Sequence, residues 1–257
     1  MNANIGKKII LCGKGGSGKS TVAALLARAF AAQGKPVLVI DSDESNFGLH
    51  VQLGIDRPAD FTKYFGHKKG IFQDGAQDVF AGGWHLEDIP DDYCVRGGAI
   101  RLMAIGKIAE AGEGCACAMG VLAKVFLEHL VLRDDEVVLV DTEAGVEHFG
   151  RGVDTFADAV LMIADPSFES IRLSGKICEM GKSISKPVFV VVNKATEQQY
   201  EWMLTALSHP EAVIGRIPMD DGVFLAGLKG EPVTQTVDGV ARILARLESL
   251  TPPSEVL

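Results

Sequence analysis

The stretch Gly13-Lys14-Gly15-Gly16-Ser17-Gly18-Lys19-Ser20 decides the fold, because it matches the phosphate-loop pattern G-x-x-x-x-G-K-[ST]. It follows a short apolar run at residues 8–12 and precedes an amphipathic stretch from residue 20 to about residue 33. That stretch repeats its apolar residues about every 3.6 positions and is followed by Gly34, a typical helix terminator. The pattern therefore lies between a predicted strand and a predicted helix, as a phosphate loop requires.

Glycines in such a loop let backbone N–H groups turn toward phosphate oxygens, and the helix N-terminus adds partial positive charge. We predict that Lys19 binds the β- and γ-phosphates of ATP and that the Ser20 hydroxyl binds Mg²⁺. A glycine-rich turn with a chance lysine is the alternative, and the flanking strand and helix argue against it. The residues of this loop expected to bind ATP are Gly13, Lys14, Gly15, Gly16, Ser17, Gly18, Lys19, Ser20 and Thr21.

Short apolar runs recur along the chain and predict the strands of a central sheet. They are continuous rather than alternating, which is typical of strands buried on both faces of a parallel sheet. Because longer amphipathic stretches separate them, we predict a doubly wound α/β fold, with a mainly parallel sheet and helices on both faces. We treat residues 1–257 as a single P-loop ATPase domain, with residues 61–132 as an elaboration of it. The predicted strands are residues 8–12, 37–40, 137–140, 159–164 and 188–192.

The composition is that of an ordinary globular protein, since 47% of the 257 residues are hydrophobic and 23% are charged. A formal net charge of −9 argues against a broad electrostatic surface for nucleic acid. No apolar run is long enough to cross a bilayer, so we expect a cytoplasmic protein without stable membrane attachment. The five cysteines are odd in number and irregularly spaced, which does not indicate a disulfide framework.

Polar residues follow the predicted strands, and in open α/β sheets such positions converge on the ligand site. Asp41 and Asp43 follow the second predicted strand, Asp141 the third, Asp165 the fourth and Asn193 the last. One carboxylate near a phosphate site can hold Mg²⁺, and another can orient the attacking water. The pattern alone leaves open which carboxylate does which, and a helix N-cap is the alternative for each. The expected Mg²⁺ ligands are Ser20, Asp43 and Asp141.

The early lysine gives the loop a special form. Lys14-Gly15-Gly16-x-Gly18-Lys19 resembles the deviant Walker A family, which includes MinD, the nitrogenase iron protein and Mrp-type carriers. The resemblance implies that Lys14 reaches the nucleotide of a partner subunit, as an arginine finger does in trans. It also implies that Asp41 positions the attacking water, that Asp141 is the Walker B carboxylate and that Gly145 senses the γ-phosphate. The residues expected to be catalytic are Lys14, Asp41 and Asp141.

Two later segments are predicted to hold the adenine base. Asn193 ends the last apolar run, and an asparagine amide can pair with the edge of a purine. The family resemblance implies that Asn193 contacts adenine and that Ile217-Pro218-Met219-Asp220 flanks it. Asn193 and Pro218 therefore join the residues expected to bind ATP. An ordinary turn at the end of a strand is the alternative.

The segment Gly114-Cys115-Ala116-Cys117 is the second informative motif. In an extended loop, residues i and i+2 project to the same side, so the thiolates of Cys115 and Cys117 can bind one metal ion. Two ligands do not complete a structural site, but a two-fold axis would add the same pair from a partner subunit. On coordination chemistry alone, four thiolates favour Zn²⁺ or an iron–sulfur cluster. Two inert thiols in a glycine-rich loop are the alternative.

The order of motifs along the chain carries a narrower resemblance. The phosphate loop, the paired aspartates, the C-x-C pair and Asp141-x-Glu143-Ala144-Gly145-Val146-Glu147-His148 resemble the CooC family of ATPases, which insert nickel into carbon monoxide dehydrogenase. The resemblance covers most of the chain and implies Ni²⁺ at Cys115 and Cys117. Ala118 stands where that family is expected to have proline, a change that could loosen the metal loop but removes no ligand.

We therefore interpret the chain as an ATP-driven metallochaperone. It is expected to form a homodimer, promoted by ATP and metal, and to serve carbon monoxide dehydrogenase as its client. One rival is an iron–sulfur carrier or electron-transfer ATPase of the same superfamily, and a second is a MinD-like switch without metal. Among the other residues, Cys12 and Cys178 are expected in the core, whereas Cys94 and His148 receive no role.

Overall fold

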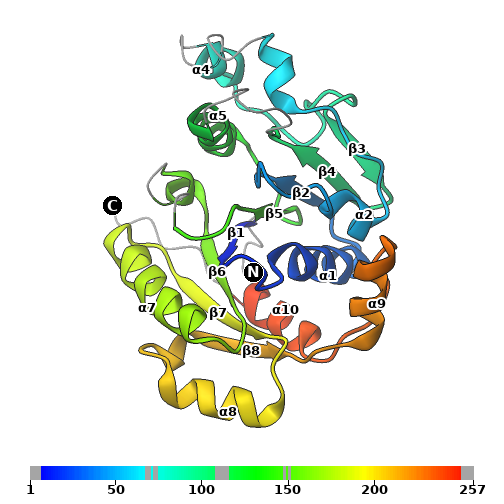
Figure 1. Cartoon of the computed structure of the whole chain (residues 1–257). Coiled ribbons are helices and arrows are strands. Elements are labelled where there is room, and N and C mark those ends of the chain that lie inside the picture. Colours follow the sequence, from blue (N-terminus) through cyan, green and yellow to red (C-terminus); the bar gives the residue numbers. More distant parts are fainter. Residues whose placement is uncertain are drawn as a thin grey trace.

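The computed structural model describes residues 7–66, 71, 75–107, 116–146, 149 and 152–249, with only the backbone of Ala116 and Cys117. The strands of this part of the chain are β1 (Lys7–Gly13), β2 (Val37–Asp41), β3 (Cys94–Gly97), β4 (Ile100–Ala104), β5 (Val137–Asp141), β6 (Ala159–Ala164), β7 (Val188–Asn193) and β8 (Val213–Ile217). They form one sheet in the order β3-β4-β2-β5-β1-β6-β7-β8 (Figure 1). Neighbouring strands run parallel except β3, which pairs antiparallel with β4.

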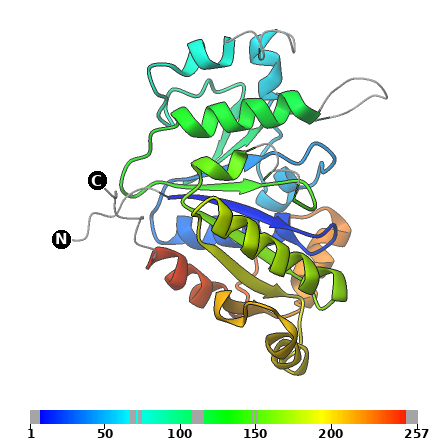
Figure 2. The same cartoon turned by 90° about the vertical axis from the view of Figure 1, so that its left-hand side faces the viewer.

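Helices cover both faces of the sheet, as Figures 1 and 2 show from two directions. The α-helices are α1 (Lys19–Ala32), α2 (Leu49–Leu53), α4 (Gly75–Phe80), α5 (Ala116–His129), α7 (Phe168–Ser183), α8 (Glu197–Ala206), α9 (Asp221–Lys229) and α10 (Val240–Glu248). The short 3₁₀ helices are η1 (Phe61–Phe65), η2 (Val153–Phe156) and η3 (Pro210–Ala212).

Alternate residues of each strand point to opposite faces, so a buried strand serves two cores. In β1, Ile9 and Leu11 pack into the core shared with α1, α2 and α10, whereas Ile10 packs into the core shared with α4 and α5. A third cluster, to which Cys12 belongs, includes residues of α7 and α8. This packing explains why the central strands read as continuous apolar runs and confirms the predicted doubly wound α/β fold.

The five predicted strands are present as β1, β2, β5, β6 and β7, and the first predicted helix is α1, after which Gly34 has a left-handed φ of 81°. Sequence patterning missed β3, β4 and β8, which lie at or near the two edges of the sheet. Arg101 interrupts the apolar pattern of β4, and Arg216 interrupts that of β8. Strands near an edge keep a polar side, which shortens their apolar signal.

The elaboration at residues 61–132 contributes to the same sheet, because it supplies β3 and β4. It also supplies α4 and α5, whose apolar residues pack with those of β2 and β5. The parallel strands bring their carboxyl ends to one edge of the sheet. There β1 lies between β5 and β6, so the loop that follows β1 starts at the point where the strand order reverses, the usual ligand site of such sheets. In the described ranges, no helix is both long and apolar enough to cross a membrane.

Candidate functional site

The phosphate loop connects β1 to α1 at the carboxyl edge of the sheet. Gly18, immediately before α1, has a φ of 95°, a left-handed conformation that side chains rarely adopt. A Cβ on Gly18 would also collide with the Asn193 amide. The Lys19 side chain turns back along the loop, with its Nζ 3.5 Å from the Gly13 carbonyl oxygen, and Lys19 is only 6% exposed. The loop thus holds a buried ammonium beside backbone N–H groups, an arrangement that suits phosphate.

The Ser20 hydroxyl is oriented from two sides. Its Oγ donates a hydrogen bond to Asp141 Oδ2 at 2.5 Å and accepts one from Asn46 Nδ2 at 2.7 Å. Because a hydroxyl has one proton and two lone pairs, one lone pair of Ser20 remains for a cation.

Asp141 is fully buried at the end of β5, and burial raises the pKa of its carboxyl to about 7 against the opposing hydrogen bond from Ser20. The nearby charge of Asp41 raises this pKa further. Asp141 Oδ1 has no hydrogen-bond partner among the described residues. A buried carboxylate oxygen without a donor is the group that Mg²⁺ would satisfy, so Ser20 and Asp141 fit the expected ion.

The carboxylates that follow β2 lie beside this pair, since Asp41 and Asp141 stand opposite each other in the register of β2 and β5. Asp43 Oδ1 accepts hydrogen bonds from the backbone and the hydroxyl of Ser45. Within the described ranges, no group of three or more His, Cys, Asp or Glu side chains could hold a metal ion. Mg²⁺ here would thus depend on one or two protein ligands and on phosphate oxygens, which is its usual mode in nucleotide sites.

Asp41 is held by a residue that the sequence did not suggest. Lys107 Nζ lies 2.7 Å from Asp41 Oδ1, and the side chain of Lys107 is only 2% exposed. Burial raises the pKa of the Asp41 carboxyl above its usual value, and the positive charge of Lys107 opposes that rise. The carboxylate predicted to position water is therefore part of a buried ion pair.

The expected trans-acting lysine lies within reach of its own subunit. Lys14 Nζ is 3.0 Å from Asp165 Oδ2, just beyond β6. Asp165 Oδ1 also accepts hydrogen bonds from the hydroxyls of Ser167 and Ser170. Burial raises the pKa of Asp165, but these bonds and the Lys14 charge outweigh it and keep the pKa below its usual value. The pair is partly exposed, with side chains 22% and 19% accessible, so it can separate at modest cost.

The segment that follows Asp141 is attached to the phosphate loop. Gly145 N donates to the Gly13 carbonyl oxygen at 3.2 Å, and Thr142 Oγ1 donates to the Leu11 carbonyl oxygen at 2.8 Å. Gly145, predicted to sense the γ-phosphate, therefore lies against the first residue of the loop.

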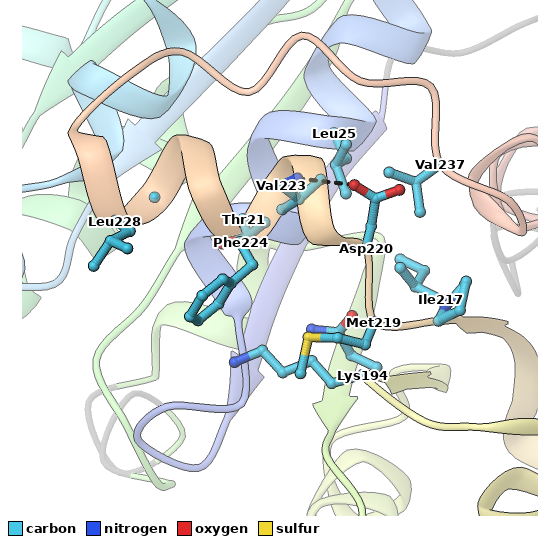
Figure 3. Close-up of a pocket in the computed structure, with 13 residues that line it drawn as sticks. Thr21, Leu25, Lys194, Ile217, Met219, Asp220, Val223, Phe224, Leu228 and Val237 are labelled. Atoms are coloured by element: carbon cyan, nitrogen blue, oxygen red, sulfur yellow. Dashed lines mark hydrogen bonds between the residues drawn. The ribbon is translucent and has the colours of Figure 1, made fainter.

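Next to the loop is a largely apolar cavity of about 330 Å³ (Figure 3). Asn193 is among the lining residues, and its Nδ2 donates one hydrogen bond to the Ser17 carbonyl oxygen at 2.8 Å, so its second N–H and its Oδ1 remain for a base. In Figure 3, Phe224 and Leu228 project from the same side of α9. Three of the residues predicted to bind ATP line this cavity, Thr21, Asn193 and Pro218. Its lining comprises Thr21, Leu25, Asn193, Lys194, Ile217, Pro218, Met219, Asp220, Val223, Phe224, Gly227, Leu228 and Val237.

The cysteines separate into two groups. Cys12 and Cys178 belong to the core as predicted, and Cys94, which had no assigned role, is a buried residue of β3. Burial raises the pKa of each of these three thiols, which makes them poor nucleophiles at neutral pH. Cys115 lies outside the described residues, as does His148, and Cys117 is placed by its backbone in the first turn of α5.

Two contributors to the site were missed from the sequence, Lys107 and Asn46. Asp165 was expected near the site because it follows a predicted strand, but its pairing with Lys14 was not predicted. Lys107 comes shortly after the apolar residues of β4, a strand that the patterning missed. Asn46 gave no signal, because its contact with Ser20 depends on how the loop after β2 folds back.

Comparisons with known proteins agree with this geometry. The family described as CobQ/CobB/MinD/ParA nucleotide binding domain matches residues 8–233. An uncharacterized ATP-binding protein of Methanocaldococcus jannaschii is 44% identical over 244 residues, covering 92% of this chain and 98% of the relative. The carbon monoxide dehydrogenase accessory protein CooC of Rhodospirillum rubrum is 29% identical over 231 residues, which cover 87% of this chain and 88% of that relative. The structure of the septum site-determining protein MinD from Pyrococcus horikoshii, complexed with Mg-ADP, superposes with a TM-score of 0.69 at 18% identity. The superposition covers 95% of this chain and 97% of that MinD chain.

Proposed function

Because the chain belongs to the CobQ/CobB/MinD/ParA nucleotide-binding family and is a P-loop ATPase, we propose that it is an ATP-driven metallochaperone. In this proposal two copies bind one divalent ion, Ni²⁺, through Cys115 and Cys117 of each chain and deliver it to carbon monoxide dehydrogenase. The observation that carries the proposal is the C-x-C pair in a chain that resembles the R. rubrum accessory protein over 231 residues. Zn²⁺ is a second ion that the same thiolates would accept.

The position of the C-x-C pair in the fold supports this assignment. Cys117 is in the first turn of α5, the helix that follows β4 in the chain. β4 is the parallel neighbour of β2, so its carboxyl end faces the same edge of the sheet as Asp41. Lys107, which binds Asp41, precedes the pair by only a few residues. A metal loop here is close in the chain to groups that respond to nucleotide.

In this proposal the residues around the phosphate loop have separate roles in the nucleotide cycle. Lys19 and the loop amides bind the phosphates, and Ser20 and Asp141 would hold Mg²⁺, which would neutralise phosphate charge. Lys14 leaves Asp165 and binds the nucleotide of the partner subunit, so closure of the dimer replaces one ion pair by another. Related MinD/ParA proteins act as dimers. Closure would bring two C-x-C pairs together, and hydrolysis would separate them.

Metal analysis of the anaerobically purified protein, with and without ATP, tests the proposal. We expect about one divalent ion per dimer, held more tightly when ATP is present, because one chain supplies only half of the thiolates. The Cys115→Ser/Cys117→Ser variant should lose the metal and metal-induced dimerisation while still binding ATP. Cys178→Ser is the matched control, since that thiol is buried in the core.

Other outcomes of these experiments would contradict the metal site or the client. Unchanged nickel stoichiometry in the double-serine variant would refute the C-x-C site. A brown protein with visible absorption would favour an iron–sulfur carrier instead. In a cell that makes a nickel carbon monoxide dehydrogenase, the double-serine variant should yield enzyme deficient in nickel, and excess nickel in the medium should restore part of its activity. Fully active dehydrogenase without added nickel would contradict the client assignment.

A further inference from the structure

Lys107 is a buried lysine whose ammonium group is fully occupied by oxygen atoms. Its Nζ forms an ion pair with Asp41 and donates hydrogen bonds to the backbone carbonyl oxygens of Asp43 and Asn46. An ammonium group has three N–H donors, so these three acceptors use all of them. The ring of Phe47 adds a cation–π contact, with its centroid 5.6 Å from the same nitrogen.

These acceptors belong to one short segment, the last residue of β2 and the loop that follows it. Lys107 therefore fixes the carboxylate of Asp41 and two points of the backbone between residues 43 and 46 from a single nitrogen atom. The segment has further internal bonds, since Gly48 N donates to Asn46 Oδ1 at 2.9 Å. The loop is thus held by a side chain that is distant in sequence and arrives from the end of β4.

The same segment reaches the expected Mg²⁺ ligand. Asn46 donates its side-chain amide to Ser20 Oγ, while its backbone carbonyl accepts from Lys107. A continuous chain of polar contacts consequently runs from Lys107 through Asn46 to Ser20 and on to Asp141. A displacement of Lys107 would move both the carboxylate assigned to the attacking water and the amide that orients Ser20.

We propose that Lys107 is a positioning residue for ATP hydrolysis, which fixes Asp41 toward the attacking water and Asn46 toward Ser20. The proposal rests on the assignment of Asp41 and on the ATPase activity of the family, and it is independent of the metal cargo. Lys107 has no route to the base cavity among the contacts described, because it does not line that cavity. Its loss should therefore affect the chemical step and the Mg²⁺ requirement far more than it affects ATP binding.

The test is a comparison of steady-state ATP hydrolysis in Lys107→Met, which keeps most of the stem and removes the charge. We expect kcat to fall about 100-fold, since a misplacement of about 1 Å in a catalytic group has an effect of this size. The KM for ATP should change less than about threefold, and the Mg²⁺ concentration for half-maximal rate should rise. Lys7→Met is the matched control, because Lys7 Nζ also binds two backbone carbonyl oxygens, those of Leu247 and Glu248, far from the site. Its kcat should equal that of the wild type.

A normal kcat in Lys107→Met would overturn the proposal, as would an equal loss of ATP binding and hydrolysis in a folded variant. If Lys107→Met does not fold, Asp41→Asn is compared with the double variant, in which no buried charge is left unpaired. Since Asp41→Asn already removes the carboxylate, the Asp41→Asn/Lys107→Met variant should lose only the share that passes through Asn46, less than about a further tenfold in kcat, and a further loss of about tenfold or more overturns the proposal. A wild-type kcat in Asp41→Asn alone would instead remove the assignment of Asp41, and none of these readouts depends on the C-x-C pair.

Discussion

The carboxyl edge of the sheet has two halves that are built differently. On the phosphate side, at β2, β5 and β1, Asp41, Asp141 and Lys19 are buried, Asp41 is paired with Lys107 at 2.7 Å, and Asp141 accepts a hydrogen bond from Ser20 at 2.5 Å. On the base side, at β7, β8 and α9, the cavity is mostly apolar, and Phe224 and Leu228 at its rim are 59% and 73% exposed. Charge that must act on a transition state has to be positioned in advance, whereas an apolar surface for a base tolerates movement. We therefore expect substitutions on the phosphate side to lower ATP binding or hydrolysis more than substitutions on the base side do.

The largest effect is expected from Lys19→Ala. Lys19 is nearly buried beside the loop, so its removal leaves the bound phosphates without their principal cation. We expect ATP binding to be abolished, with an affinity loss of more than about 1000-fold, as when one member of a buried charge pair is lost. Calorimetric titration with Mg-ATP measures it. Wild-type affinity in this variant would show that the loop does not bind the phosphates in the predicted way.

The second effect concerns the predicted contact between Lys14 of one subunit and the nucleotide bound by the partner subunit. Lys14→Gln should bind ATP but hydrolyse it about 1000-fold more slowly, because a trans-acting cation contributes at least that factor. Mixing Lys14→Gln with Asp41→Asn should restore part of the activity, since one site of a heterodimer then has both wild-type groups. Activity absent from every mixture, despite confirmed heterodimers, would exclude the trans role. Asp165→Ala is the informative partner variant, because it removes the contact that holds Lys14 within its own subunit.

A smaller effect is expected on the base side. Gly227 lines the cavity, and a Cβ there would meet no atom within 4 Å. Gly227→Phe should therefore partly fill the cavity and lower ATP affinity about tenfold, while binding of inorganic triphosphate stays unchanged. Gly227→Ala is the control and should stabilise α9 by about 0.5–1 kcal/mol without loss of affinity. Equal weakening of ATP and triphosphate would mean that the cavity does not hold the base.

The smallest effect is a pH dependence of stability that arises from Asp141. Its pKa is raised to about 7, above the usual value near 3.8, so the folded state binds a proton that the unfolded state has already released. Without nucleotide, the free energy of unfolding should therefore fall as pH rises from about 4 to about 7, by at most about 1.4 kcal/mol per pH unit from this group. Asp141→Asn should flatten that slope in denaturant titrations. An identical slope in variant and wild type would show that Asp141 is not the titrating group.

The sequence determined the class of fold and the chemistry of its ligand. Short continuous apolar runs are typical of central strands with both faces covered, and the phosphate loop between one such run and a helix specifies a nucleotide site. The same local patterns placed Asp41 and Asp141 at strand ends, where β2 and β5 bring them into register. Asn193 and Pro218, both predicted to bind ATP, line one cavity in the folded chain.

The tertiary structure decided which residues hold those groups. Edge strands such as β8 have weak apolar signals, so their place in the sheet depends on packing against neighbours rather than on local pattern. Lys107 contacts Asp41 although 66 positions of sequence separate them, and Asp165 contacts Lys14 from the end of β6, the strand next to β1. No local periodicity encodes such pairs, because they exist only after the parallel strands have brought their carboxyl ends together. The sequence specified the reactive groups, and the folded sheet specified their partners.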